Sequence, residues 1–175
     1  MHWKMSSVGT EDLMKALDRQ EVNLSTLGPK IEARQLSLSQ LNKLQKYVCE
    51  GGSLPNNLTH FRISPTRATC MSVAFLYELP TSIKNLHLAD IWFVDTDGSQ
   101  FRDFSVFKRF PDLKRLSVSG FTVTDPNTVN FLEKIGLYDC DLLGDVQGWY
   151  KQRMRDALDA LARRNSKRKR GEDNV

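Results

Sequence analysis

The chain has 175 residues, of which 40% are hydrophobic and 26% charged, so one globular domain with a core is expected and a disordered body is not. The net charge of +4 comes from residues 163–175, which hold six cations and two anions, so a basic nucleic-acid surface on the body is not expected. Three cysteines without a close pair, Cys49, Cys70 and Cys140, favour free buried thiols in a reducing compartment. No leader-like start and no apolar run of membrane-spanning length is seen, which predicts a soluble intracellular protein with no membrane partner.

The first predicted element is a short amphipathic helix over residues 9–19, with Thr10 as its N-cap and Leu13 and Leu17 turned inward. After it, pairs of apolar residues two apart recur, each bounded by polar residues, as is typical of short strands with one buried face. The pairs are Leu36/Leu38, Phe61/Ile63, Leu86/Leu88, Leu116/Val118 and Ile135/Leu137. An apolar residue and a proline precede three of them, at Leu54-Pro55, Leu79-Pro80 and Phe110-Pro111. This recurrence predicts a repeat.

The segments between the pairs are predicted to be short helices, because their apolar residues have helical spacing. They are residues 40–50, which end at Gly51-Gly52, residues 69–79, residues 100–110 and a segment that begins at Asp125-Pro126. Residues 89–101 form an insertion, in which an extra strand around Trp92 precedes an Asp-Thr-Asp-Gly turn. A C-terminal helix over residues 144–164 and a disordered basic tail over residues 165–175 complete the chain.

Residues 27–143 resemble the leucine-rich repeat family, whose consensus is LxxLxLxx(N/C)xL. The match is carried by EKIGLYDCDLL, with Ile135, Leu137, Cys140 and Leu142 in register, and by SIKNLHLADIWF and LKRLSVSGF. The resemblance implies an α/β fold: a short solenoid with a parallel sheet of about five short strands, capped by residues 1–26 and 144–164. An ordinary α+β domain with strands at similar spacings is the alternative. The long, irregular units are most similar to F-box-associated repeats, which implies substrate recognition for ubiquitin ligation, although the first 35 residues resemble no F-box.

In a solenoid, residues between the buried leucines point to solvent in a row, and binding is expected there. This row is small and polar and contains Arg62, His87 and Tyr138, and we expect it to contact a protein partner rather than a phosphate backbone. Trp92 in the insertion is a candidate anchor for the same partner, with burial in the core as the alternative.

The end of the chain carries a cluster that resembles a nuclear localisation signal and predicts a nuclear or nucleocytoplasmic protein that binds an import receptor. The cluster consists of Arg163, Arg164, Lys167, Arg168, Lys169 and Arg170. Ser166 within it resembles a site for a basophilic kinase. A solvated charged end is the plain alternative, and phosphate binding by this segment of a nucleic-acid-associated protein is the second functional hypothesis.

No arrangement of residues predicts catalysis, a metal site or a cofactor. Asp95, Asp97 and Gly98 have the wrong spacing for a calcium loop and predict a turn. The three histidines, His2, His60 and His87, are too scattered along the chain to propose a zinc site, and neither a phosphate loop nor a nucleophile elbow is present. We therefore predict a non-catalytic protein–protein interaction module of the adaptor or substrate-recognition type.

Overall fold

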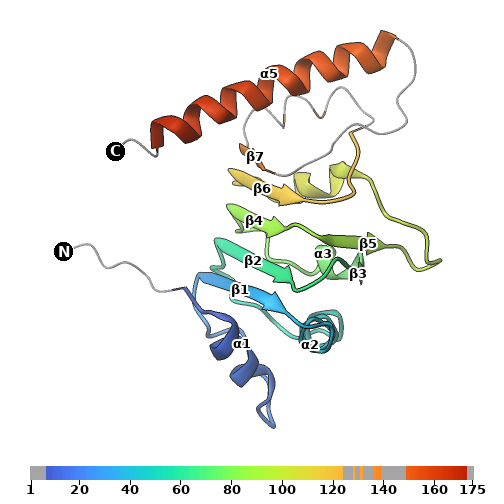
Figure 1. The fold of residues 1–175 in the computed structure, drawn as a ribbon. Helices are drawn as coiled ribbons and strands as arrows, with labels where there is room; N and C mark the ends of the chain where they lie inside the picture. Colours follow the sequence, from blue (N-terminus) through green and yellow to red (C-terminus); the bar gives the residue numbers. More distant parts are fainter. Residues whose placement is uncertain (1–6, 124–127, 129–130, 132–135, 139–148, 173–175) are drawn as a thin grey trace.

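The fold is a mixed α/β arrangement in which five parallel strands form one sheet, two further strands form a second sheet, and helices lie at both ends (Figure 1). The computed structural model describes residues 7–123, 128, 131, 136–138 and 149–172. The strands of the main sheet, in spatial order, are β1 (Lys30–Leu36), β2 (His60–Pro65), β4 (Asn85–Leu88), β6 (Arg115–Val118) and β7 (Gly136–Tyr138). The predicted parallel sheet is therefore present, and its spatial order follows the order of the chain.

The core lies on one side of the main sheet. Ile31, Phe61, Leu86 and Leu116 are paired in register across four strands, and all four side chains are buried. Because side chains alternate along a strand, these residues and their neighbours two positions on form apolar rows that face α2 (Leu38–Cys49) and α3 (Ala74–Tyr77). The Phe61 ring lies 6.2 Å from that of Phe75 in α3, which ties the sheet to the helical side.

Two backbone features recur from strand to strand. The carbonyl oxygens of Pro29, Thr59 and Lys84 each accept two N–H groups, at 2.7–3.1 Å, from the two residues at the entry of the next strand. Farther along, the residue four positions after the inward Ile31, Leu86 and Leu116 has a positive φ. These residues are Gln35 (φ 55°), Asp90 (φ 65°) and Gly120 (φ 77°). The equivalent position after Phe61 is Pro65, whose ring fixes φ at a negative value.

Two of the predicted strand pairs are wrong. The buried pair of β1 is Ile31/Ala33, which is in register with Phe61/Ile63, whereas Leu38 begins α2 and is 59% exposed. At the other end, Leu137 pairs with Leu116 and not with Val118. The consensus alignment of this unit is therefore two residues out of register. Ile135, Cys140 and Leu142, which also carried that alignment, lie outside the described residues, as does the start of the helix predicted at Asp125-Pro126.

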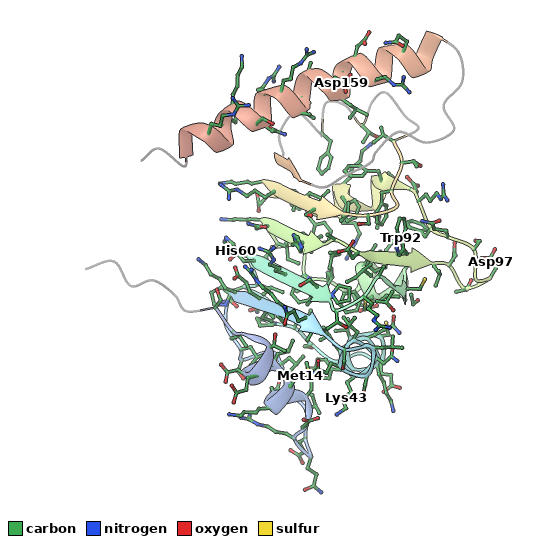
Figure 2. All side chains as sticks on the ribbon, viewed as in Figure 1. Met14, Lys43, His60, Trp92, Asp97 and Asp159 are labelled. Atoms are coloured by element: carbon green, nitrogen blue, oxygen red, sulfur yellow. The ribbon has the colours of Figure 1, made fainter. Side chains whose placement is uncertain are left out.

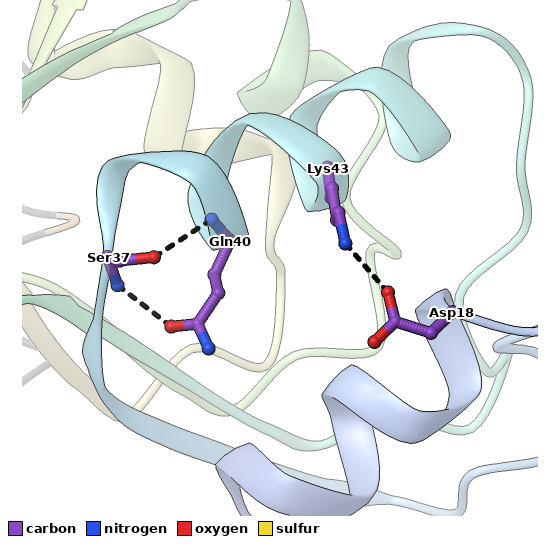
Figure 3. A network of polar contacts seen from close by, with 4 residues as sticks. All are labelled: Asp18, Ser37, Gln40 and Lys43. Carbon is purple, nitrogen blue, oxygen red and sulfur yellow. Dashed lines mark hydrogen bonds and ion pairs between the residues drawn. The ribbon is translucent and has the colours of Figure 1, made fainter.

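A capping box explains why the chain leaves β1 for a helix at Leu38 (Figure 3). The Ser37 hydroxyl accepts the Gln40 N–H at 3.2 Å, and the Gln40 side chain accepts the Ser37 N–H at 2.9 Å. This reciprocal pair satisfies two donors that the start of a helix leaves without partners. The helix predicted over residues 40–50 is confirmed as α2, with Leu41, Leu44 and Val48 buried.

The next two predicted helices are largely replaced by other structure. Residues 69–79 contain β3 (Thr69–Ser72) before the short α3, because β3 pairs in parallel with β5 (Ile91–Val94) in the second sheet. This pairing is a tertiary contact that helical spacing does not reveal. Residues 100–110 contain a 3₁₀ helix, η1 (Phe104–Arg109), whose rings Phe104 and Phe107 are buried. The extra strand predicted around Trp92 is confirmed as β5.

Helices close both ends of the main sheet. At the first end, α1 (Thr10–Leu17) contacts β1, but its N-cap is Gly9, because the Thr10 hydroxyl instead bonds the backbone of Arg34. At the other end, α5 (Trp149–Glu172) contacts β7 and continues past residue 164, so most of the expected disordered tail is helical. Leu158, Leu161 and Asn165 are buried at the spacing of one helical face, which extends the packed side of α5 into the tail.

Candidate functional site

The candidate site is the open face of the main sheet, defined as the face opposite the core. Two in-register rows cross it. The middle row is Glu32, Arg62, His87, Ser117 and Tyr138, and the entry row, at the start of the strands, is Lys30, His60, Asn85, Arg115 and Gly136. Neighbouring strands lie about 4.8 Å apart, so each row is a regular line of residues across the sheet.

The structure brings together three of the four predicted partner-binding residues. Arg62 and His87 are direct neighbours in the middle row and are half-buried, and Tyr138 joins the same row by its register with Ser117. Trp92 is not in this row. It lies in β5 beyond the far end of β4, and Figure 2 places it at the opposite end of the strands from His60. The role of all four residues in binding stays a prediction.

Sequence reasoning missed the entry row. Lys30 and Arg115 immediately precede the inward residues Ile31 and Leu116, so alternation places them on the open face. The same rule, applied one position earlier in each strand, would have found them. Lys30 was hidden for a second reason, because β1 was predicted at Leu36/Leu38. The open face therefore carries more fixed positive charge than Arg62 alone.

The pKa of the His60 imidazole reflects the charges around the entry row. Burial lowers the pKa of its imidazole below the ordinary 6.5, and Lys30, Arg115 and Lys84 lower that pKa further, while Glu32 raises it. The ring Nδ1 lies 2.9 Å from the Thr59 hydroxyl, which itself donates to the Pro29 carbonyl at 3.2 Å. The lowered pKa favours the neutral form of the His60 imidazole, in surroundings that hold more positive than negative charge.

Two buried polar atoms of the middle row have no hydrogen-bond partner among the described residues. They are Arg62 Nε and the hydroxyl of Ser117, whose side chain is only 3% exposed. A buried donor without a partner costs about 1–3 kcal/mol, so such atoms are rare in native proteins. Both groups can donate a hydrogen bond. The middle row therefore has unused capacity to bind an acceptor.

Trp92 proves to be part core and part surface. Its neighbours Ile91 and Phe93 are buried, while Trp92 itself is 38% exposed on the other side of β5. Its ring lies against the backbone of Gly120, where a Cβ would come within 2.5 Å of Trp92 Cζ3. Only glycine leaves room for the ring there. The indole is held on one face and presented to solvent on the other.

The basic cluster lies on α5 as an exposed helical surface. Arg163, Arg164, Lys167, Arg168 and Arg170 are exposed, and Ser166 is exposed among them. An open groove of about 580 Å³ runs along this part of the helix, lined by several of the same cations and by Ala160 and Ala162. Lys169 belongs to the same helix. The exposed Ser166 hydroxyl is open to a kinase from solvent, and the import and phosphorylation roles of this segment stay predictions.

The structure also describes the predicted turn of the insertion and two of the three cysteines. Residues 95–99 form a turn, as predicted, in which the Asp97 carboxylate accepts from the backbone and hydroxyl of Ser99. The predicted burial of the thiols is wrong for Cys49 and Cys70, which are exposed because the inward positions beside them belong to Val48 and Met71.

Within the described residues, no three His, Cys, Asp or Glu side chains are placed to hold a metal ion. No described helix has both the length and the apolar surface needed to cross a membrane.

Comparison of the chain with protein families, with curated proteins and with solved structures finds no match.

Proposed function

We propose that the chain is a short solenoid of irregular leucine-rich repeats and a non-catalytic protein–protein interaction module of the adaptor or substrate-recognition type. Its binding surface is the open face of the main sheet, with the exposed side of Trp92 as a second contact. The observation that carries the proposal is the pair of in-register rows, since they present polar and charged side chains in regular lines across parallel strands.

The two recurring backbone features support the repeat part of the proposal. The carbonyls that each accept two N–H groups, and the positive φ four residues after the inward position, mark equivalent points of successive units. A stack of such units buries one continuous core and needs a cap at each end, which α1 and α5 supply. The units depart from the consensus at its Asn/Cys position, where buried Leu36, Ile91 and Phe121 stand instead.

The composition of the open face favours a protein partner. Glu32 lies beside Arg62 in the middle row, so the row presents one charge of each sign and then the polar groups of the following strands. A long phosphate backbone favours a surface of one sign, whereas a folded or extended protein segment presents both signs and matches such a row. Five strands span roughly 20 Å at 4.8 Å per strand step, which is the length of about six extended residues.

Photo-crosslinking tests this proposal in cells that express the full chain. A photoreactive amino acid is placed at Arg62 or His87 on the open face, and, as matched controls, at the exposed Lys46 of α2 or Lys108 of η1. We expect one protein to be captured at both open-face positions and at neither control. Equal capture at the controls, or capture at the controls only, would contradict the proposed surface.

The basic surface of α5 supports a second candidate function, in which this segment binds nucleic-acid phosphates or a nuclear import receptor. The supporting observation is the run of exposed cations from Arg163 to Arg170 around one groove. Phosphorylation of Ser166 would weaken either contact by placing negative charge among these cations. Removal of residues 163–175 should abolish nucleic-acid affinity and nuclear accumulation and leave crosslinking at His87 unchanged.

A further inference from the structure

Positive charge gathers at the entry end of the open face. Lys30 and Arg115 belong to the entry row, and Lys84 immediately precedes β4 at the same end. Lys30, Arg115 and Lys84 all lower the pKa of His60, against the opposite effect of Glu32, which is consistent with their position at one end of the face. Glu32 is the one described acidic residue within the two rows. Lys30 and Lys84 take no part in the two ion pairs, Lys15–Glu11 and Lys43–Asp18, that join side chains of the described residues.

The hydrogen-bonding groups beside this charge require an acceptor. Arg62 Nε can only donate, and the Ser117 hydroxyl is an available donor in the same row, with His87 between them. Water or a neutral amide could accept from either group, but neither would also offset the charge of Arg62 and the entry row. An ionised carboxylate accepts at both oxygens and carries the complementary charge, and charge-assisted bonds of this kind are about twice as strong as neutral ones.

We propose that the open face recognises an acidic segment of a protein partner, with an aspartate or glutamate carboxylate bound at Arg62 and Ser117 and further acidic residues lying along Lys30, Lys84 and Arg115. This inference rests on the proposed function and names the chemistry of the partner. Both donors are buried in the free chain, so the Arg62 guanidinium has to turn, and the side chains that cover the Ser117 hydroxyl have to move, as the segment docks.

A protein carboxylate fits this site better than a nucleic-acid phosphate. Arg62 Nε and the Ser117 hydroxyl are buried, so a ligand reaches them only after neighbouring side chains move. A carboxylate at the end of a flexible side chain needs less room for this than a phosphodiester, which is joined to sugars on both sides. In addition, Glu32 stands beside Arg62 and repels a continuous line of phosphates more than it repels a segment with spaced carboxylates.

The test measures binding of three labelled probes to the full chain by fluorescence anisotropy at low salt. The probes are a glutamate-rich peptide, the same peptide with glutamine at each glutamate, and a single-stranded oligonucleotide of equal charge. We expect the glutamate peptide to bind most tightly and to lose affinity as salt is added. Arg62→Gln and Arg115→Gln should each weaken its binding about tenfold, the effect of losing one charge-assisted hydrogen bond.

Lys46→Gln and Lys108→Gln are the matched controls, because they remove exposed cations from outside the open face. Thermal melting of each variant shows that the fold is retained. The proposal is overturned if the glutamate and glutamine peptides bind equally, if the controls weaken binding as much as Arg62→Gln, or if the oligonucleotide binds more tightly through the same residues. If any of these three results is obtained while crosslinking at Arg62 and His87 persists, the acidic chemistry of the partner is wrong and the proposed protein-binding face is retained. If crosslinking at these two positions is lost as well, both proposals are wrong.

Discussion

At the scale of single residues, Gly120 links the repeat geometry to the exposed tryptophan. It occupies the position of positive φ that Asp90 occupies one unit earlier, and it also lacks the side-chain atoms that would collide with the Trp92 ring. Asp90 meets the first requirement without a glycine, since a non-glycine residue can adopt positive φ at a modest cost. The second requirement is what fixes glycine at residue 120.

Gly120→Ala should therefore destabilise the protein by more than backbone strain alone. Gly98→Ala is the matched control, because Gly98 has a similar φ of 82° and nothing within 4 Å of an added Cβ. We expect Gly98→Ala to cost about 1 kcal/mol of unfolding free energy and Gly120→Ala about 2–3 kcal/mol, as measured by urea denaturation.

A double variant separates the two causes at residue 120. If the ring is the obstacle, Gly120→Ala in a Trp92→Ala background should cost no more than Gly98→Ala. Equal losses for Gly120→Ala with and without the indole would show that Trp92 does not rest on this glycine, and its orientation toward solvent would then be wrong.

At the scale of elements, the junction between β1 and α2 decides where the first strand lies. Leu36 is fully buried at the end of β1, and Leu38, two residues later, is exposed in the first turn of α2. Leu36→Ala should lower the free energy of unfolding by about 2–4 kcal/mol, whereas Leu38→Ala should change it by less than about 0.5 kcal/mol. Chemical denaturation of the two variants measures both values. Similar losses of unfolding free energy for the two variants would instead support Leu36 and Leu38 as the buried pair of the first strand.

Strands β2, β4 and β6 could be predicted from the sequence because two large apolar residues mark each one, as Phe61 and Ile63 do. β1 was misplaced because its second inward residue is the small Ala33, while Leu36 and Leu38 imitate a pair. β3 could not be predicted, since its stability depends on β5, which lies far along the chain. Nonlocal pairing of this kind leaves no local periodicity.

The candidate site was predictable to a similar degree. Arg62 and His87 stand between two buried residues of a correctly placed strand, so alternation alone assigns them to the open face. Lys30, His60 and Arg115 lie just before the inward residues, so the same alternation assigns them to this face, but they form one row only because neighbouring strands start in register. Register is a property of the assembled sheet, and the unused donors of Arg62 and Ser117 appear only when side chains are placed.

At the scale of the whole molecule, described elements cover both outer edges of the main sheet. Val8 forms a parallel bridge with Ile31 along the outer edge of β1, donating to Lys30 O and accepting from Glu32 N at 2.8 Å each. α5 contacts β7 at the opposite edge. Covered edges oppose pairing with strands of other chains, so a partner is directed to the side chains of the open face.

Chemical footprinting of the native histidines tests this central claim most directly, because His60 and His87 stand one in each row of the open face. The captured partner is added to the full chain, and modification by diethylpyrocarbonate is followed by mass spectrometry, with labelling of Lys46 and Lys108 as the internal reference. The account predicts that both histidines become protected when the partner binds while the two lysines react as before. Unchanged reactivity of His60 and His87 in the complex, with protection of Lys46 or Lys108, would contradict it.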